Sequence, residues 1–347
     1  MRPLVAGPPT LAALAAALDG SGPALLTTEE PRVVAALRPQ DGVDDDVAVV
    51  VPTSGSTGTP KGVLLSAEGL LAVAHAALDR LGGPGRWLLA IPATHVGGLQ
   101  VLVRSLLAGV DPVVVPPGPF GAASLAGSAG CAYVSLVPTQ LRRLAPADLA
   151  GFDAVLLGGA ATPAALRAPF GNVVTTYGMS ETGGGCVYDG VPLAGVEVSA
   201  GSGSSTGSRV RVRGPGLALG YRDGTPLRDP DGWFTTGDVG TLADGRLVVH
   251  GRADDVVVTG GEKVAPAAVE AALAAHPAVR EVAVAGLPDP EWGQRVVAWV
   301  VGTVTLEEAR SWVADRVGRA AAPREVRHLE ALPLLANGKI DRVSLTS

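Results

Sequence analysis

Short apolar segments alternate with segments rich in alanine and leucine between residues 46 and about 176, and this alternation restricts the fold more than any other feature. Short apolar runs separated by helical stretches are typical of buried strands in a mostly parallel sheet with helices packed on it. The pattern predicts strands at residues 47–51, 87–91, 113–115, 133–136, 154–157 and 173–176, and helices at residues 67–81 and 96–107 and near Gln140.

The pattern changes twice in the rest of the chain. From Val191 to about His250 no helical segment is evident, and alternating segments such as residues 209–213 lie among many glycines, which predicts a small antiparallel sheet or barrel. Residues 201–208 have the composition of a flexible loop. After Arg252, the sequence predicts helices at residues 266–275 and 306–316 and strands at 281–285 and 295–301.

These segments predict two domains in a chain of 347 residues, since a single core seldom extends beyond roughly 250 to 300 residues. We expect an α/β protein whose large amino-terminal domain, residues 1–252, has parallel-rich sheets with helices. A small barrel-like β part at about residues 191–251 belongs to this domain. Residues 253–347 are expected to form a small α+β carboxy-terminal domain.

Charge and composition argue against several classes of protein. The net charge is −6 and no segment concentrates arginine with aromatic residues, so a nucleic-acid surface is not expected. No run is apolar enough to insert into a membrane. Cys131 and Cys186 lack metal-ligand spacing to any histidine, so we expect neither a zinc site nor a disulfide framework. A reducing cytoplasmic setting fits, and prolines interrupt the only stretch that resembles a secretory leader.

The three lysines among the 27 basic residues all lie in recognisable motifs. Lys61 ends a run of Ser, Thr and Gly, Lys263 follows a Gly-Gly-Glu sequence, and Lys339 follows Asn-Gly. Arginine serves as the cation elsewhere, so these positions favour a compact ammonium over a forked guanidinium. Chance placement in a glycine-rich chain stays an alternative, above all for Lys263.

Residues 53–62, Thr-Ser-Gly-Ser-Thr-Gly-Thr-Pro-Lys-Gly, follow a predicted strand and precede a predicted helix. Their backbone N–H groups and hydroxyls can wrap a polyphosphate, and Lys61 adds a point charge. The segment is not a Walker loop, because Pro60 stands where the second glycine belongs and no Ser or Thr follows Lys61. The candidate phosphate ligands are Thr53, Ser54, Gly55, Ser56, Thr57, Gly58 and Lys61.

This segment resembles the phosphate loop of the adenylate-forming enzymes, which include acyl-CoA synthetases, nonribosomal adenylation domains and luciferases. Further motifs occur in that family's order, so the resemblance covers residues 52–342. It implies an adenine site at Gly158, Gly159, Ala160, Tyr177 and Gly178, a ribose site at Asp238 and Arg252, and a hinge at Asp254. It also implies catalytic roles for Lys339, Glu181, Ser180 and His95, with Glu181 as the magnesium ligand. Ser180 stands where threonine is usual in the family.

The resemblance implies a two-step reaction with ATP, Mg²⁺ and coenzyme A. A carboxylate attacks the α-phosphorus of ATP to give an acyl-adenylate, and Lys339 aligns the reacting groups. The carboxy-terminal domain then turns about Asp254 and the thiol of CoA attacks the acyl carbonyl. The tunnel for CoA is expected at Gly260, Gly261, Glu262 and Lys263.

Few residues precede the phosphate loop, which is unusual in this family. With segments 89–99, 104–109, 135–141 and 184–190, this shortening most resembles the short actinobacterial 2-succinylbenzoate–CoA ligases of menaquinone synthesis. An acyl pocket is then expected at Arg104, Gln140 and Gly184, beside His95.

A dicarboxylate acid needs its unreactive carboxylate neutralised, and Arg104, Arg142 and Arg143 are the candidates. Each of them can equally be a solvated surface charge, and His95 can be a satisfied core residue. Other acyl- or aryl-CoA ligases, a stand-alone adenylation enzyme that loads a carrier protein or an amine, and an inactive nucleotide-binding scaffold stay open. The sequence also leaves assembly as a homo-oligomer open.

Overall fold

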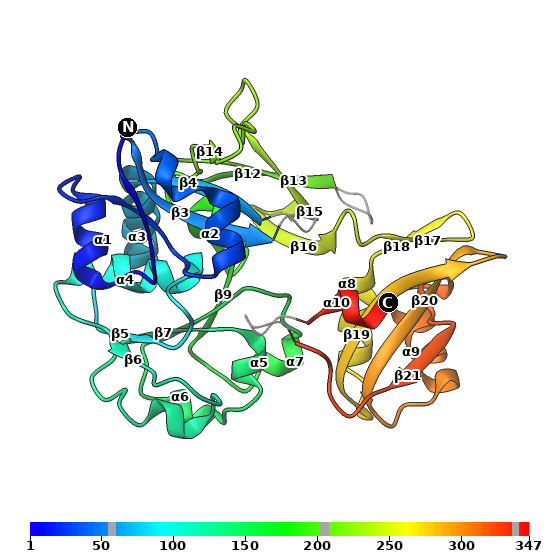
Figure 1. Cartoon of the computed structure of the whole chain (residues 1–347). Helices are drawn as coiled ribbons and strands as arrows, with labels where there is room; N and C mark the ends of the chain where they lie inside the picture. Colours follow the sequence, from blue (N-terminus) through cyan, green and yellow to red (C-terminus); the bar gives the residue numbers. More distant parts are fainter. Residues whose placement is uncertain (55–59, 202–207, 335–339, 347) are drawn as a thin grey trace. The chain divides into compact units, whose positions relative to one another are not determined.

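The computed structural model describes residues 1–54, 60–201, 208–334 and 340–346 (Figure 1). The chain forms two compact units. Unit 1 comprises Met1–Gly159, Phe170–Val198 and Arg211–Thr235. Unit 2 comprises Ala160–Pro169, Ser199–Val210 and Thr236–Ser347. The domain boundary after residue 252 stays a prediction.

The first sheet of unit 1 has the strand order β1-β2-β3-β4-β14. The first three strands are parallel, and the last two are antiparallel to their neighbours. Its buried residues include Leu26, Val47 and Val50, so the apolar runs form the core as predicted. The strands are β1 (Leu4–Ala6), β2 (Ala24–Leu26), β3 (Val47–Ser54), β4 (Pro60–Ser66) and β14 (Gly220–Tyr221).

Strand β4 corrects the expectation that the phosphate loop runs from a strand into a helix. β3 and β4 pair as an antiparallel hairpin, with Thr53 opposite Lys61. Val63 and Leu65 point into the core, and this alternation of buried residues fixes the segment as a strand. Helix α3 (Ala67–Leu81) begins only afterwards, where Ser66 caps it by accepting from the N–H of Gly69.

The second sheet of unit 1 has the order β11-β10-β9-β8-β7-β5-β6 and is parallel from β9 to β6. Strands at 133–136 and 154–157 and the helix at 67–81 have the predicted bounds. The strands are β5 (Trp87–Leu89), β6 (Val113–Val114), β7 (Tyr133–Leu136), β8 (Ala154–Leu157), β9 (Val173–Met179), β10 (Gly184–Tyr188) and β11 (Val191–Pro192).

Helix α4 (Val96–Ala108) carries the predicted site residue Arg104 and is largely buried in unit 1. It packs on α1 (Leu11–Leu18), α3, β5 and β10 (Figure 1). Because these elements surround it, even its polar residues Gln100 and Arg104 are buried. The other helices of unit 1 are the short α2 (Pro31–Leu37), α5 (Pro138–Leu141) and α6 (Pro146–Leu149).

The predicted helix-free region forms a four-stranded sheet of order β12-β13-β15-β16. Its last two strands are antiparallel, with Asp238 opposite Arg252. Between Thr182 and Pro266 the described residues contain no helix, as expected. The strands are β12 (Glu197–Ser199), β13 (Ser208–Arg213), β15 (Phe234–Ala243) and β16 (Arg246–Arg252).

The rest of unit 2 is an α+β sandwich. The sheet order is β18-β17-β20-β19, and β21 runs parallel to β20. Val269, Val284 and Val313 belong to one buried core that the helices close (Figure 1). The elements are β17 (Val257–Thr259), β18 (Glu262–Val264), β19 (Val279–Asp289), β20 (Gly293–Gly302), β21 (Glu325–His328), α8 (Pro266–Ala274), α9 (Leu306–Arg316) and α10 (Arg342–Thr346). Unit 2 also includes the short helix α7 (Ala164–Arg167), which is not part of this sandwich.

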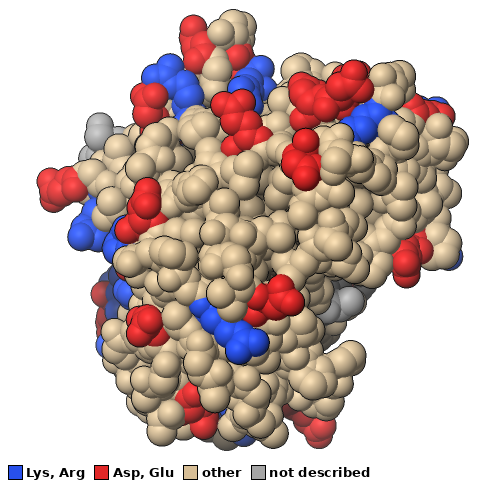
Figure 2. All heavy atoms as spheres, turned by 90° about the vertical axis from the view of Figure 1, so that its left-hand side faces the viewer, with Lys and Arg blue, Asp and Glu red and all other residues tan. Residues whose placement is uncertain are grey.

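The surface shown in Figure 2 is mostly uncharged, and its acidic and basic residues are interspersed. This face therefore carries no continuous basic patch of the kind that binds nucleic acid. No helix of the described residues has the length and apolar character to cross a bilayer. Both cysteines are free and buried.

Candidate active site

The predicted adenine residues of unit 1 lie at the ends of two neighbouring parallel strands. Gly158 and Gly159 follow β8, and Tyr177 and Gly178 lie in β9. A Cβ on Gly158 would collide with the Thr176 hydroxyl, so only glycine fits this close approach. A Cβ on Gly178 would likewise meet the carbonyl oxygen of Gly184. Ala160, the fifth predicted residue, is exposed.

A single turn at Ser180–Thr182 presents Glu181 directly after β9. The buried Thr182 hydroxyl accepts from the N–H of Met179 at 2.9 Å and contacts the carbonyl oxygen of Gly184 at 2.7 Å. The N–H of Ala218 donates to the Glu181 carbonyl at 2.9 Å. The backbone under the Glu181 carboxylate is therefore fixed on both sides.

Tyr221 joins Glu181 to the phosphate-loop strand. Its hydroxyl donates to Glu181 Oε1 at 3.0 Å, and Lys61 Nζ lies 5.2 Å from the centroid of its ring. Burial, and then the nearby carboxylate of Glu181, raise the pKa of Tyr221, so the phenol stays protonated and donates. Among the described residues, neither Glu181 nor Lys61 forms a close ion pair, although Lys61 lies near enough to Asp223 to help lower the pKa of that carboxyl.

The donor set fits magnesium held by a nucleotide. In the described part of the chain, no group of three or more His, Cys, Asp or Glu is arranged to hold a metal ion by itself. Mg²⁺ in nucleotide enzymes usually needs one or two carboxylates, because phosphates and waters complete its octahedron. Glu181 supplies one carboxylate and has a described partner only on Oε1.

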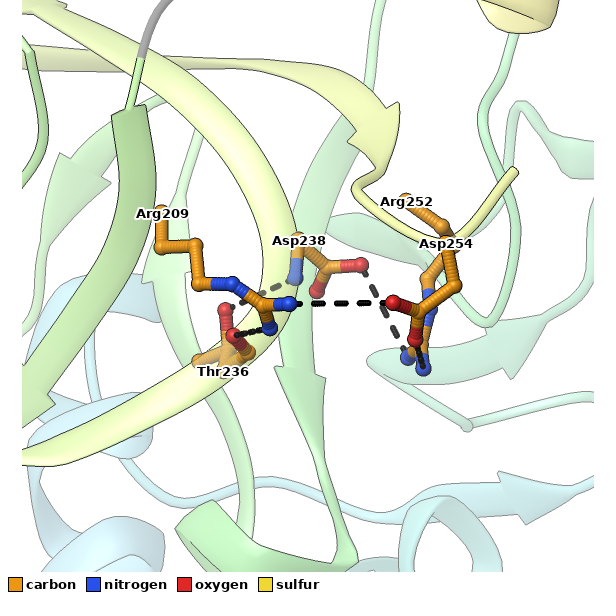
Figure 3. A network of polar contacts seen from close by, with 5 residues as sticks. All are labelled: Arg209, Thr236, Asp238, Arg252 and Asp254. Atoms are coloured by element: carbon orange, nitrogen blue, oxygen red, sulfur yellow. Dashed lines mark hydrogen bonds and ion pairs between the residues drawn. The ribbon is translucent and has the colours of Figure 1, made fainter. Parts of the chain in front are cut away.

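The predicted ribose and hinge residues of unit 2 form one polar network (Figure 3). Asp238 and Arg252 are cross-strand neighbours on β15 and β16, with 3.9 Å between Oδ1 and Nη1. Arg209 of β13 reaches the carboxylate of Asp254 at 3.6 Å, and Arg252 reaches it at 4.0 Å. The Asp238 side chain is 13 % exposed, whereas that of Asp254 is 67 % exposed. Asp238 therefore has a defined orientation, and Asp254 is held by two exposed cations.

Arg104 is the most unusual polar residue of unit 1, because it is only 4 % exposed. Its guanidinium lies 4.1 Å from the ring centroid of Trp87, Nε donates to the Gln100 carbonyl at 2.8 Å, and Nη1 reaches the Tyr188 hydroxyl at 3.4 Å. Burial lowers the pKa of Arg104. Among the described residues it has no carboxylate partner, and Trp87 Nε1 is also buried without a hydrogen bond.

The other predicted acyl-pocket residues have simpler surroundings. His95 is exposed at the start of α4, with Nδ1 3.2 Å from the Thr94 hydroxyl, so it is not a core histidine. Both ends of the Gln140 amide are hydrogen-bonded, since Nε2 donates to the Ala90 carbonyl and Oε1 accepts from the Val137 N–H. Gly184 has φ +131°, and a Cβ there would lie 2.9 Å from Gln100 Cγ. Arg142 and Arg143 are exposed, so Arg104 alone of the three candidate arginines is buried.

The predicted CoA segment is the tip of a hairpin in unit 2. Gly260 and Gly261 have φ of +59° and +84° and form the two-residue turn between β17 and β18. Glu262 and Lys263 follow on β18 and are exposed. Five predicted site residues, Gly55, Ser56, Thr57, Gly58 and Lys339, lie outside the described residues.

Three residues at the site were not singled out from the sequence: Tyr221, Gln100 and Arg209. Gln100 donates to the Gly183 carbonyl at 2.8 Å and the Leu70 carbonyl at 3.2 Å. A glutamine on an otherwise apolar helix face is a usable signal, because a buried amide needs partners. Tyr221 and Arg209 gave no such signal, since their partners are distant in sequence.

Comparison with known proteins finds two family models that together match most of the chain. The AMP-binding enzyme model matches residues 9–222, and the AMP-binding enzyme C-terminal domain model matches residues 268–339. A probable 2-succinylbenzoate–CoA ligase of Mycobacterium tuberculosis is 48 % identical over 96 % of this chain and 94 % of its own length. The 2-succinylbenzoate–CoA ligase of Escherichia coli is 36 % identical over 84 % of this chain and 67 % of its own.

Solved structures of similar proteins match nearly the whole chain. The o-succinylbenzoate CoA synthetase (MenE) of Bacillus subtilis, in complex with the acyl-adenylate intermediate OSB-AMP, has a TM-score of 0.76 and 26 % identity. That match covers 97 % of this chain and 81 % of the other. The amide bond synthetase McbA of Marinactinospora thermotolerans has a TM-score of 0.78 and 28 % identity, covering 99 % and 79 %. With both family models matched and such close relatives, the chain belongs to the AMP-binding enzyme family.

Proposed function

We propose that the protein joins 2-succinylbenzoate to coenzyme A at the expense of ATP, releasing AMP and pyrophosphate. Two relatives, 48 % and 36 % identical to the chain over the aligned residues, carry this activity in their names. The single structural observation that carries the choice of acid is Arg104, a buried cation without a carboxylate partner among the described residues.

The acid has two carboxylates and only the succinyl one reacts, so the aromatic one needs a fixed cation. A buried carboxylate without a partner costs several kcal/mol. Arg104 offers a guanidinium already oriented by Trp87 and Tyr188. Its planar fork can meet a carboxylate with two parallel hydrogen bonds. We assign the aromatic carboxylate to Arg104, and the position beside the reacting carboxylate to His95.

The first step forms the acyl-adenylate. The succinyl carboxylate oxygen bonds to the α-phosphorus of ATP while the bond to the pyrophosphate oxygen breaks. Gly158, Gly159, Ala160, Tyr177 and Gly178 hold the adenine, and Asp238 accepts hydrogen bonds from the ribose hydroxyls beside Arg252. Lys61 and the residues at 53–58 steer the pyrophosphate, and Ser180 adds a hydroxyl beside Glu181. Lys339 stabilises charge that grows on the α-phosphate oxygens.

Magnesium, when held by Glu181 and the nucleotide, supplies further positive charge to the phosphates. The Glu181 carboxylate lies directly after the end of β9, and the hydrogen bond from Tyr221 limits its rotation.

The second step transfers the acyl group to CoA. The thiol sulfur bonds to the acyl carbon, the bond to AMP breaks, and the thiol proton is released. Residues 253–347 turn about Asp254 before this step, which brings Gly260, Gly261, Glu262 and Lys263 to the pantetheine. Ion pairs to Asp254 from Arg209 and Arg252 at 3.6 and 4.0 Å involve exposed side chains, and such pairs are weak enough to exchange.

A cytoplasmic location also belongs to this proposal. The free thiols of Cys131 and Cys186 support a reducing compartment.

Pyrophosphate release with a panel of aromatic, fatty and amino acids, with and without CoA, tests the function. We expect the fastest release with 2-succinylbenzoate and AMP release that depends on CoA, with the thioester identified by mass. Preference for a fatty or amino acid contradicts the substrate. AMP release driven by an amine in place of CoA would favour an amide synthetase, which is the activity in the name of the structurally similar McbA.

A further inference from the structure

Tyr221 lies where two charged residues of the site meet. Its hydroxyl donates to Glu181 Oε1 at 3.0 Å, and its ring centroid lies 5.2 Å from Lys61 Nζ. Glu181 and Lys61 therefore contact the same side chain and form no ion pair with each other.

The main chain around Tyr221 is firmly held. Tyr221 pairs with Val63 and Gly220 with Leu64, so the residue extends the sheet that carries Lys61. The next residue, Arg222, donates its N–H to the Gly62 carbonyl at 2.7 Å. Its guanidinium also binds the carbonyls of Leu37 and Arg38 at 2.9 and 2.8 Å. The ring of Tyr221 is thus placed by the same strands that place Lys61.

A direct ion pair between Glu181 and Lys61 would make both side chains unavailable to magnesium and phosphate. Two opposite unit charges in contact near a protein surface attract each other strongly. In that pairing the carboxylate would be turned from the metal, and the ammonium from the phosphates. A phenol can contact both, because its hydroxyl donates to a carboxylate and its π face attracts an ammonium.

We propose that Tyr221 is a positioning residue for adenylation, which holds Glu181 toward the magnesium–nucleotide complex and keeps Lys61 apart from Glu181. This inference deepens the proposed function and rests on it, because it assigns magnesium to Glu181 and phosphate to Lys61. Tyr221 acts through these two residues and touches no reacting atom.

Two substitutions separate the hydroxyl from the ring. Tyr221→Phe removes only the hydrogen bond to Glu181, and Tyr221→Leu removes the ring as well. Tyr133→Phe is the matched control, because it also removes a tyrosine hydroxyl in unit 1, one that donates to the Gly83 carbonyl at 3.0 Å.

Binding of ATP is measured by calorimetry with and without Mg²⁺, in the absence of any acid. Pyrophosphate release is measured as a function of Mg²⁺ concentration. Thioester formation is measured from supplied acyl-adenylate. For Tyr221→Phe we expect magnesium–ATP binding about tenfold weaker, since hydrogen bonds to charged groups are the strong ones. The half-saturating Mg²⁺ concentration should rise, and thioester formation should stay within about twofold. Tyr221→Leu should weaken magnesium-free ATP binding as well.

Wild-type affinity and Mg²⁺ dependence in Tyr221→Phe overturn the proposal. Equal loss in both half-reactions, with a melting temperature lowered beyond that of Tyr133→Phe, also overturns it by showing a structural role. Binding of ATP is measured without an acid, so it still tests Tyr221 if 2-succinylbenzoate is not the substrate.

Discussion

Arg104 in unit 1 and Arg342 in unit 2 are both bound by backbone carbonyls, but within the described ranges only Arg342 has a carboxylate partner. Arg342 Nη2 lies 2.7 Å from Glu270 Oε1, and Nη1 donates to the Val284 carbonyl at 2.7 Å. The same Glu270 oxygen accepts the N–H of Val284 at 2.7 Å. Arg104 has instead an aromatic face and a phenol hydroxyl.

We propose that this difference separates a cation whose counter-ion comes from the fold from one whose counter-ion comes from a ligand. The pair of Glu270 and Arg342 ties α10, which follows the predicted catalytic lysine, to α8 and β19. Arg104, although more deeply buried, is left with weaker partners. A buried charge without a counter-ion opposes folding, so its presence is best explained by a bound anion.

The largest effect on stability is expected from Arg342→Met, because it leaves the carboxylate of Glu270 buried without its cation. Arg342 is 36 % exposed, so water offsets part of the cost. We expect the free energy of unfolding to fall by about 2–4 kcal/mol in urea titrations. The double variant that adds Glu270→Gln should recover part of the loss. A change below about 0.5 kcal/mol would show that the pair is not a structural one.

Arg104→Met makes the same change at the other arginine and should act differently. The thioether fills much of the space against Trp87 and removes a cation that burial penalises. We expect the free energy of unfolding of the empty protein to stay level or to rise by about 1–2 kcal/mol. A loss as large as that of Arg342→Met would mean that Arg104 is also completed by the fold.

Glu270 also predicts a smaller, pH-dependent effect. Burial raises the pKa of Glu270 above its ordinary 4.5, although Arg342 and the Val284 N–H oppose the shift. The folded protein then binds this proton more tightly than the unfolded chain, so stability falls as pH rises from 4.5 through the raised value. Glu270→Gln should remove this decline, which is at most about 1.4 kcal/mol per pH unit. Unfolding at several pH values is the measurement. A stability of the wild type that rises over the same window, relative to the variant, contradicts it.

Much of the fold follows from local sequence. The strand at 154–157 has its predicted bounds because it is a short, continuous apolar run. The helices at 67–81 and 306–316 have theirs because a capping residue, Ser66 or Thr305, precedes each of them. Strand β4 was missed because glycine and serine around it suggested a turn, whereas pairing with β3 decides its conformation.

The motifs located the candidate residues but not their environments. Sequence gave equal standing to Arg104, Arg142 and Arg143, and only the packing of α1, α3, β5 and β10 around α4 buries the first of them. The link from Tyr221 to Glu181 joins residues 40 positions apart and has no local signature. Such contacts depend on strand order, which a single sequence does not state.

If Arg104 binds the second carboxylate of the acid, its removal should weaken the enzyme's discrimination between a dicarboxylate and a monocarboxylate substrate. Wild type and Arg104→Met are compared by kcat/KM for 2-succinylbenzoate and for 4-oxo-4-phenylbutanoate, the same acid without its aromatic carboxylate. Arg142→Met, an exposed arginine, is the control. We expect the wild-type preference for the dicarboxylate to fall by about 10²-fold in Arg104→Met and to persist in the control, since losing one partner of a buried charge pair costs roughly 2–5 kcal/mol. An unchanged preference in Arg104→Met would contradict the account.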